Sequence, residues 1–321
     1  MDNICHHFQK NKIKDIDKLS IRGYNQNTVR IYKENHHMKL GIRYNMYLET
    51  FSCYGDEKFK KIKSFGFDCV DVGLGNTNVS VYTLPEDEAE KILIKERNLA
   101  KDADIEICQV HGPWCWPPPE TDEEGKKKRM EEMKRSIRAT KTLGCKFWVV
   151  HPIMPYLTED LGTDKEKLTW QENLEFMREL LSCAKENGVT ICLENMPMPQ
   201  FSIATPQQIL NFVKEIDDEN FKICLDVGHV AVFENLSVQE EIRRLGKEIK
   251  TLHIHDNDVG PDMHLLPYDG RIEWDEVSEA LKSIGYDGVF SVELNVPSKA
   301  PRHIRESWLK LIAEIAEHIA K

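Results

Sequence analysis

Residues 188–229, GVTICLENMPMPQFSIATPQQILNFVKEIDDENFKICLDVGH, contain a short apolar run, a segment with helical spacing and a second apolar run. The runs at 188–195 and 221–227 have the length of buried strands, and 205–216 has the period of an amphipathic helix. Each run ends close to a carboxylate. A strand, a helix and a strand in this order predict a parallel βαβ unit.

The same alternation extends from residue 39 to the C-terminus. Strands are predicted at 39–45, 69–75, 105–111, 145–151, 188–195, 221–227, 249–256 and 288–295. Helices are predicted at 56–65, 86–103, 122–143, 167–187, 205–216, 237–247, 273–284 and 302–320, several of them ending at a glycine. Eight such units can close without leaving an open sheet edge. We therefore predict an α/β fold, a (β/α)8 TIM barrel, as a single domain over 39–321 with a short N-terminal extension at 1–38.

The extension is polar and lacks periodicity, so we expect it to be disordered or peripheral. Met38 stands directly before the first strand and is a candidate natural start. The extension contains no apolar stretch typical of a signal peptide, and the chain has no run long enough to cross a bilayer. Nine cysteines without a CxxC pair are typical of reduced thiols. We expect a cytoplasmic protein without a membrane partner.

Charge argues against a nucleic-acid partner. The 54 acidic residues outnumber the 43 basic ones, and the formal net charge is −11. The densest basic run, 126–129, is flanked by glutamates at helical spacing, which predicts a solvated helix face. A small-molecule substrate is the better expectation.

Most of the predicted strands end in a side chain that can bind a metal. These side chains belong to His111, His151, Glu194, Asp226, His253 and Glu293, and His229 follows Asp226 by three residues. Because the C-terminal ends of barrel strands meet at one mouth, these residues are expected to be neighbours.

Strand alternation separates an outward apolar set from an inward polar set. The inward set contains Glu194, Asp226, His253 and Glu293. Three inward carboxylates would repel one another unless a cation neutralised them. These four residues are therefore predicted to bind one divalent metal. Three oxygens and one nitrogen favour Mn²⁺, with Mg²⁺, Co²⁺ or Zn²⁺ as alternatives.

Further polar and aromatic residues are expected around the same mouth. His111, His229, His255, Asp262 and His264 are candidates for substrate binding, proton transfer or further metals, with His255 placed behind the first ligands. The loop GPWCWPPPET presents Trp114 and Trp116, whose faces suit a sugar or an aryl group, or which simply pack the loop onto the barrel.

The most specific segments are LENMP at 193–197, LDVGH at 225–229, HIHDND at 253–258, DMH at 262–264 and GRIEWDEVSEALKSIGYDGVFSVE at 270–293. With them, the chain from Lys39 onward resembles the xylose isomerase-like barrel superfamily of sugar phosphate isomerases and epimerases. That superfamily also includes D-tagatose 3-epimerase, inosose dehydratase and endonuclease IV. The resemblance implies that Glu194, Asp226, His253 and Glu293 hold the family's single metal. It also implies that Glu194 and Glu293 form the acid/base pair, and we add His151 to the catalytic candidates.

The predicted activity is proton transfer through an enediolate on a sugar, polyol or related carbonyl substrate. One alternative is an inosose-type dehydratase or the metal-bearing subunit of a C-glycoside-cleaving enzyme. Another is an endonuclease IV-like zinc phosphodiesterase, because the histidines and carboxylates also match that enzyme's three-metal ligand positions. The NMPMPQF segment departs from the TAGQG-like turn of that enzyme. A third is a non-catalytic metal-dependent binding subunit. A homo-oligomer or a small partner subunit is compatible with each of them.

Overall fold

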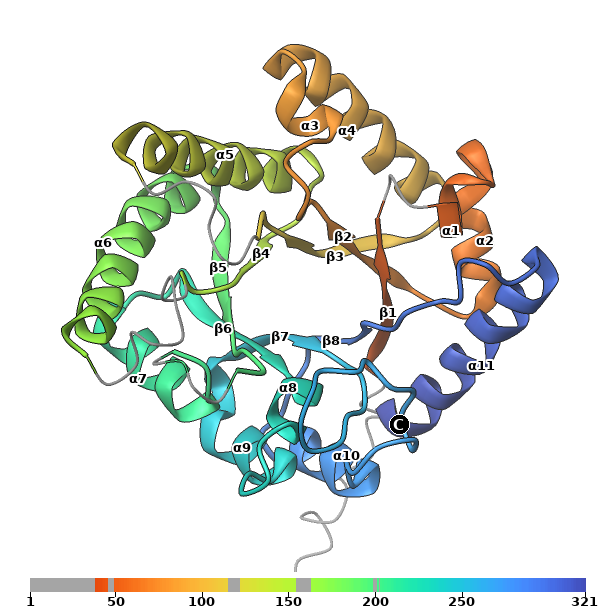
Figure 1. Cartoon of the computed structure of the whole chain (residues 1–321). Helices are drawn as coiled ribbons and strands as arrows, with labels where there is room; N and C mark the ends of the chain where they lie inside the picture. Colours follow the sequence, from red (N-terminus) through yellow and green to blue (C-terminus); the bar gives the residue numbers. More distant parts are fainter. Residues whose placement is uncertain (1–37, 46–48, 115–121, 154–162, 199–200, 202) are drawn as a thin grey trace, which may run out of the picture. The chain divides into compact units, whose positions relative to one another are not determined.

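The computed structural model describes residues 38–45, 49–114, 122–153, 163–198, 201 and 203–321. The eight strands are β1 (Lys39–Tyr44), β2 (Cys69–Gly73), β3 (Glu106–His111), β4 (Phe147–Val150), β5 (Thr190–Glu194), β6 (Phe221–Asp226), β7 (Ile249–His253) and β8 (Val289–Val292). They form one sheet in the order β7-β6-β5-β4-β3-β2-β1-β8. The strand pairs are parallel, and a parallel bridge between Ile254 and Val292 joins the two ends of the sheet. The fold is a TIM barrel, as predicted (Figure 1).

Helices surround the barrel. The longer ones are α2 (Lys58–Phe65), α4 (Glu86–Asp102), α5 (Glu123–Thr142), α6 (Asp164–Asn187), α7 (Pro206–Ile216), α9 (Val238–Leu245), α10 (Trp274–Ser283) and α11 (Arg302–Ala320). Short helical segments are α1 (Glu49–Ser52), η1 (Gly55–Glu57), α3 (Ser80–Thr83), α8 (Val227–Ala231) and η3 (Gly246–Glu248). The longer helices were predicted from periodicity. The short segments were not, because one helical turn is too brief to show a period.

Local capping chemistry explains where the βα units begin and end. At the start of α7, the Thr205 side chain accepts a hydrogen bond from the Gln208 backbone, and the Gln208 side chain accepts one from the Thr205 backbone. This capping box satisfies two backbone donors that the helix itself leaves without partners. At the end of α2, Gly66 adopts a φ of 112°, which a residue with a Cβ rarely takes.

The barrel wall has an apolar outer face and a mixed inner face. Leu193 and Leu225 point to the helices and belong to the main core, whereas Cys192 and Cys224 form a separate small cluster inside the barrel with Val149. The alternation predicted from sequence is therefore confirmed. It sends the residues with the parity of Glu194 into the barrel, where the C-terminal strand ends form the mouth. In the described residues, no helix is long and apolar enough to span a membrane.

Candidate metal centre

Four buried residues at the barrel mouth form a compact cluster of potential metal ligands. One ligand atom from each of Glu194, Asp226, His253 and Glu293 lies within 4.8 Å of the others. The Nδ1 atom of His253 is 2.9 Å from Glu194 Oε1 and 2.9 Å from Glu293 Oε2. Such distances are expected between two ligand atoms that bind the same ion with bonds of about 2.1 Å each. We call this group the strand-tip cluster, because β5, β6, β7 and β8 deliver it.

The strand-tip cluster is electrostatically prepared for a cation. Burial opposes ionisation of Glu194, but the positive charge of His253 and the hydrogen bonds of His111 and His151 outweigh it and hold the Glu194 pKa well below its usual value. Burial likewise opposes ionisation of Glu293, and His253 with Arg43 keeps the pKa of that carboxyl low. The two carboxylates are therefore anionic even without an ion. Their donor set, with Asp226, fits a divalent metal.

The metal-facing orientation of His253 has support from behind. Asp71 is 2% exposed on β2, and its Oδ2 atom lies 3.1 Å from His253 Nε2. Gln109 donates a hydrogen bond to the same oxygen at 3.1 Å. A carboxylate behind a ligating imidazole keeps the proton on the far nitrogen and leaves the near nitrogen free for a metal.

Two further histidines converge on Glu194. The Nε2 atoms of His111 and His151 lie 3.2 Å and 2.9 Å from Glu194 Oε2, and 3.2 Å from each other. His111 donates its Nδ1 hydrogen to the Gly112 carbonyl oxygen at 2.9 Å. Burial lowers the pKa of His151 despite the nearby Glu194, so its imidazole is neutral near pH 7. A neutral imidazole at this position can accept or relay a proton.

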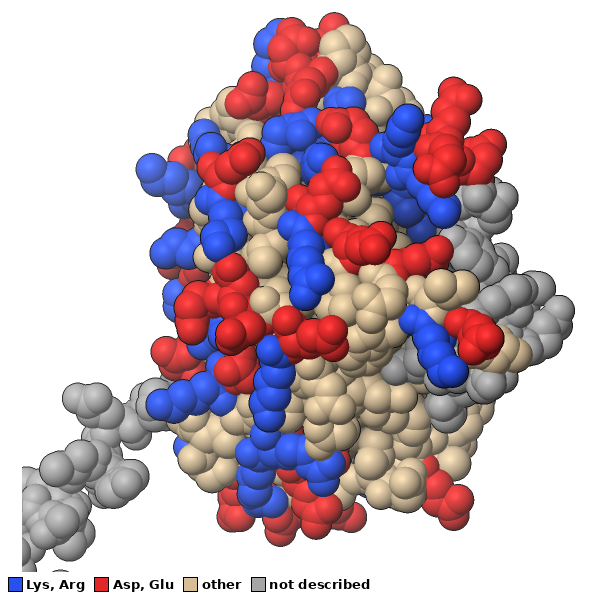
Figure 2. All heavy atoms as spheres, turned by 90° about the vertical axis from the view of Figure 1, so that its left-hand side faces the viewer, with Lys and Arg blue, Asp and Glu red and all other residues tan. Residues whose placement is uncertain are grey.

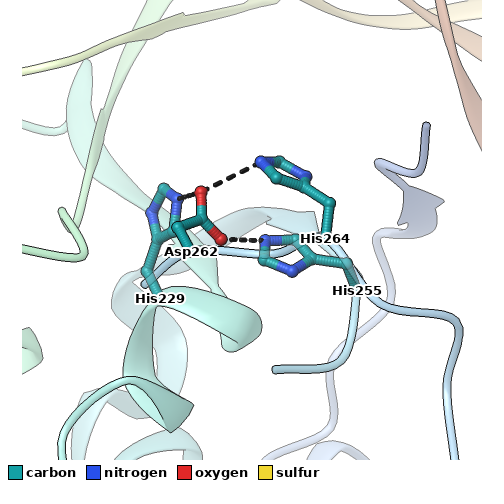
Figure 3. Close-up of side chains that lie close together, drawn as sticks. All are labelled: His229, His255, Asp262 and His264. Atoms are coloured by element: carbon teal, nitrogen blue, oxygen red, sulfur yellow. Dashed lines mark ion pairs between the residues drawn. The ribbon is translucent and has the colours of Figure 1, made fainter. Parts of the chain in front are cut away.

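A second group of ligand-type residues lies beside the first. His229, His255, Asp262 and His264 bring one ligand atom each to within 4.8 Å of the others. Figure 3 shows Asp262 between the three imidazoles. Its carboxylate oxygens lie 3.4 Å from the Nε2 atom of His229, 3.9 Å from that of His255 and 3.0 Å from that of His264. We call this group the loop cluster, because Asp262 and His264 come from the segment between β7 and α10.

The imidazoles of the loop cluster are oriented by backbone carbonyls. His229 Nδ1 donates to the backbone carbonyl oxygen of Asn195 at 2.7 Å, and His264 Nδ1 donates to the backbone carbonyl oxygen of Glu293 at 2.9 Å. Burial lowers both pKa values, but Asp226 and Asp262 raise that of His229 to about 10, and Asp262 and Glu293 raise that of His264 to about 9. Without a metal both rings are therefore protonated, and a metal would have to displace a proton from each Nε2.

Asp256 holds the segment that carries Asp262 and His264. Its carboxylate accepts hydrogen bonds from the backbone nitrogens of Asn257, Tyr268 and Ile272 and from the indole of Trp274. Its backbone also pairs with Leu265 in both directions. A side chain at Gly270 would overlap this carboxylate. Asp256 is thus a buried anchor for the segment that supplies Asp262 and His264 to the loop cluster.

The two clusters meet at Asp226. This carboxylate belongs to the strand-tip cluster and also lies 3.0 Å from His255 Nε2. It caps α8 by accepting a hydrogen bond from the His229 backbone at 2.7 Å, which places His229 in the mouth. Gly228 lies against the His255 ring so closely that a Cβ would overlap it. The segment LDVGH therefore serves both clusters.

A cavity of about 450 Å³ opens above both clusters. Trp114 lines it and contacts the edge of the His151 ring, with the ring centres 5.1 Å apart. Arg43, at the end of β1, lines it from the other side and lies 2.6 Å from Glu293 Oε1. This volume lies within the usual range of small-molecule sites.

Comparison with known proteins identifies the family. Residues 59–318 match the family described as Xylose isomerase-like TIM barrel. The chain belongs to this family. It is 30% identical over 260 residues to the uncharacterized protein MJ1311 of Methanocaldococcus jannaschii, covering 80% of this chain and 83% of that protein.

Sugar epimerases are among the relatives of this xylose isomerase-like barrel. It is 28% identical over 264 residues to D-psicose 3-epimerase of Ruminiclostridium cellulolyticum, covering 80% of this chain and 83% of the relative. The crystal structure of a D-tagatose 3-epimerase-like protein superposes with a TM-score of 0.66 at 28% identity, covering 88% of this chain and 99% of that one.

The structure of this family member brings together most of the residues singled out from sequence. Glu194, Asp226, His253 and Glu293 share one cluster. The other histidines and Asp262 surround it, and His255 Nε2 lies 3.0 Å from Asp226 Oδ1. Trp114 lines the cavity, whereas Trp116 falls outside the described residues.

Three residues with evident roles in the geometry were not singled out from sequence. They are Arg43, Asp71 and Asp256. For Arg43 a signal was present, because it has inward parity at the end of a predicted strand. Asp71 had the same inward parity in the second predicted strand. For Asp256 there was no signal, because its partners are backbone groups of a segment without periodicity.

Proposed function

We propose that this protein is a divalent-metal-dependent epimerase or isomerase acting on a sugar or a related polyol. The observation that carries the proposal is the approach of two buried carboxylates, Glu194 and Glu293, to one point beside His253 at 2.9 Å each. The two glutamates come from strands that β6 and β7 separate, so they reach this point from different directions. The activities for which the epimerase relatives are named agree with this chemistry.

The proposed reaction moves a proton at the carbon next to a carbonyl. A divalent ion held by Glu194, Asp226, His253 and Glu293 would supply Lewis acidity toward the substrate oxygens. One glutamate takes the proton from one face of the carbon, and the other returns a proton to the opposite face. His151 holds the Glu194 carboxylate and is placed to relay a proton to a substrate oxygen. From its donor set, we assign manganese as the first candidate ion.

Solvent exchange at carbon tests this proposal without knowledge of the natural substrate. D-psicose and D-tagatose, the sugars named for the relatives, would be incubated in D₂O with the metal-loaded protein and followed by NMR. We expect deuterium at the carbon next to the carbonyl together with the 3-epimer. Glu194→Gln and Glu293→Gln should each remove both signals, because each deletes one proton carrier.

Glu241→Gln is the matched control for these variants. Glu241 is also buried, at 2% exposure, but it lies on α9 outside both clusters. Loss of exchange in Glu194→Gln and Glu293→Gln, with exchange kept in Glu241→Gln, supports the assigned roles. Unchanged exchange in either active-site variant would remove that glutamate from the proposal.

A second candidate function, a zinc phosphodiesterase like endonuclease IV, is favoured by the loop cluster and by the two histidines beside Glu194. Together these groups offer ligands for more than one ion. Against it, the formal net charge is −11, and Figure 2 shows a side of the barrel on which Lys and Arg side chains are interspersed with Asp and Glu rather than gathered. A protein that grips a duplex uses a continuous basic surface.

Counting metal ions separates the two candidates. Elemental analysis of the purified full chain would measure Mn, Zn, Co and Fe per protein. About one ion per chain, lost in a Glu194→Gln, Glu293→Gln double variant, supports the epimerase. About three zinc ions per chain, together with cleavage of DNA at abasic sites, would replace it with the phosphodiesterase.

A further inference from the structure

Arg43 is the feature of the cavity that proton transfer at the strand-tip cluster does not require. Among the described residues that line the cavity, it is the one Lys or Arg side chain. The other polar lining comes from amides, imidazoles and carboxylates, such as Asn45, Asn76 and Asp262. The cavity therefore has one permanent positive charge, since a guanidinium keeps its proton at any pH at which the protein is folded.

The Arg43 guanidinium is tethered but not saturated. Its Nη1 atom donates to Glu293 Oε1 at 2.6 Å, and within the described part of the chain its other donors have no hydrogen-bond partner. The Arg43 side chain is 45% exposed, whereas that of Glu293 is 10% exposed. A guanidinium has five N–H groups. The tether thus fixes the direction of the group and leaves donors facing the cavity.

The charge balance of the mouth does not oppose an anionic group beside Arg43. A divalent ion and Arg43 together balance the three negative charges of Glu194, Asp226 and Glu293. The remaining carboxylate that lines the cavity, Asp262, is paired with His229 and His264. A substrate oxyanion at Arg43 would therefore meet no net negative charge on this wall.

We propose that Arg43 binds an oxyanion of the substrate, so that the enzyme prefers acidic sugars or polyols over neutral ones. The planar N–H fork of a guanidinium pairs with a carboxylate through two parallel hydrogen bonds, and with a phosphate in the same way. A carboxylate is the better fit, because the described cavity offers one guanidinium and no second fixed cation for a doubly charged phosphate. The inference rests on the proposed epimerase function and narrows its substrate class.

The test measures binding rather than turnover, so that it does not depend on the reaction. Calorimetry on the metal-loaded full chain would compare D-gluconate, D-glucitol and D-glucitol 1-phosphate, which share a six-carbon chain and differ at C1. We expect gluconate to bind at least about tenfold more tightly than glucitol, which corresponds to 1.4 kcal/mol. Glucitol 1-phosphate as the tightest ligand would keep an oxyanion at Arg43 but overturn the choice of carboxylate.

Three variants assign the preference to Arg43. In Arg43→Gln the ratio of gluconate to glucitol affinity should fall to about one. In Arg43→Lys part of the preference should remain, because the charge is kept and the fork is lost. Arg243→Gln is the control, since Arg243 is 43% exposed and has one ion pair, with Glu276, on the outer helix α9.

Two results would overturn the inference. One is equal affinity of the native protein for gluconate and glucitol, including no measurable binding of either. The other is a gluconate preference that survives in Arg43→Gln, which would show that the carboxylate binds the metal instead. Either result leaves the epimerase proposal standing, because deuterium exchange on neutral sugars tests that proposal separately. Conversely, absence of exchange with an Arg43-dependent preference would refute the reaction but keep the subsite.

Discussion

The strand-tip cluster and the loop cluster contain similar side chains but obtain their geometry in different ways. In the strand-tip cluster, closure of the barrel brings together residues from four successive strands. Glu194, Asp226 and His253 are the last residues of their strands, and Glu293 directly follows β8. In the loop cluster, Asp262 and His264 sit on an irregular segment whose shape depends on Asp256. One cluster is positioned by the sheet, whereas the other includes two residues on a segment that buried polar side chains such as Asp256 and Asn257 hold in place.

The strand-tip cluster is therefore expected to be the more rigid of the two, and the loop cluster the more adjustable. Sheet hydrogen bonds fix the spacing of the strand ends, so the first cluster resists small sequence changes elsewhere. The irregular segment has no such ladder, and His264 adopts a φ of 48°, a conformation that costs free energy unless neighbours enforce it. The comparison predicts that the two clusters can be damaged independently.

The largest expected effect comes from removing the carboxylates of the strand-tip cluster. In the Glu194→Gln, Glu293→Gln double variant we expect loss of the bound metal and a fall in exchange activity of more than about 10³-fold, since both proton carriers are lost. The Asp262→Asn, His264→Gln double variant should keep the metal of the strand-tip cluster. Elemental analysis of both proteins makes the comparison. Parallel metal loss in both would show that the clusters are one unit.

Removing the anchor of the loop cluster should have the next largest effect. Asp256→Ala leaves the backbone donors of Asn257, Tyr268 and Ile272 and the indole of Trp274 without this acceptor, which we expect to cost about 3 kcal/mol of unfolding free energy. Urea unfolding measures that cost, and hydrogen exchange should report faster exchange over 257–273. Metal binding at the strand-tip cluster should persist. Uniformly faster exchange across the barrel would contradict a local role for Asp256.

A smaller effect is expected at the support behind His253. Asp71→Asn should weaken metal binding by about 10- to 100-fold, because an amide no longer favours the tautomer with the proton on the far nitrogen. Titration of the metal-free protein by calorimetry measures this affinity. Exchange over 257–273 should be unchanged. Equal metal affinity in the native protein and in Asp71→Asn would show that Asp71 only fills the barrel interior.

The last expected effect is a pH dependence of stability to which the histidines of the loop cluster contribute. The pKa of His264 is about 9 and that of His229 about 10 in the folded protein, against about 6.5 for an unfolded histidine. Their contribution to stability is complete below pH 6.5 and is lost as the pH rises toward 9 and 10. Urea midpoints of the metal-free protein should fall over this window. In Asp262→Asn the fall should be shallower, and an unchanged slope would rule out Asp262 as its cause.

The sequence predicted the strand-tip cluster better than the loop cluster for a physical reason. Strand alternation has a period of two, so the direction of Glu194 or Asp226 follows from the burial of its neighbours. The segment between β7 and α10 has no period, and the positions of Asp262 and His264 depend on the distant contacts of Asp256. Family resemblance indicated those two residues, but periodicity could not.

The barrel itself was predictable because the sequence signals that start and end its strands and helices are local. Alternating apolar runs, helical spacing and glycines such as Gly66 give the same answer at each unit. Arg43 shows the limit of this approach. Its inward direction followed from parity, but its pairing with Glu293 depends on closure of the sheet, which brings the first strand beside the last.

The tight contact between Gly228 and the His255 ring has an evolutionary consequence. Because a side chain at position 228 would displace the imidazole, mutations at the two positions are not independent. A lineage that replaces His255 with a smaller residue releases the constraint on Gly228, and only afterwards is a larger residue tolerated there. Steric overlap therefore sets the order of these two replacements. Descendants of this barrel should carry a side chain at position 228 only when the side chain at position 255 is smaller than histidine.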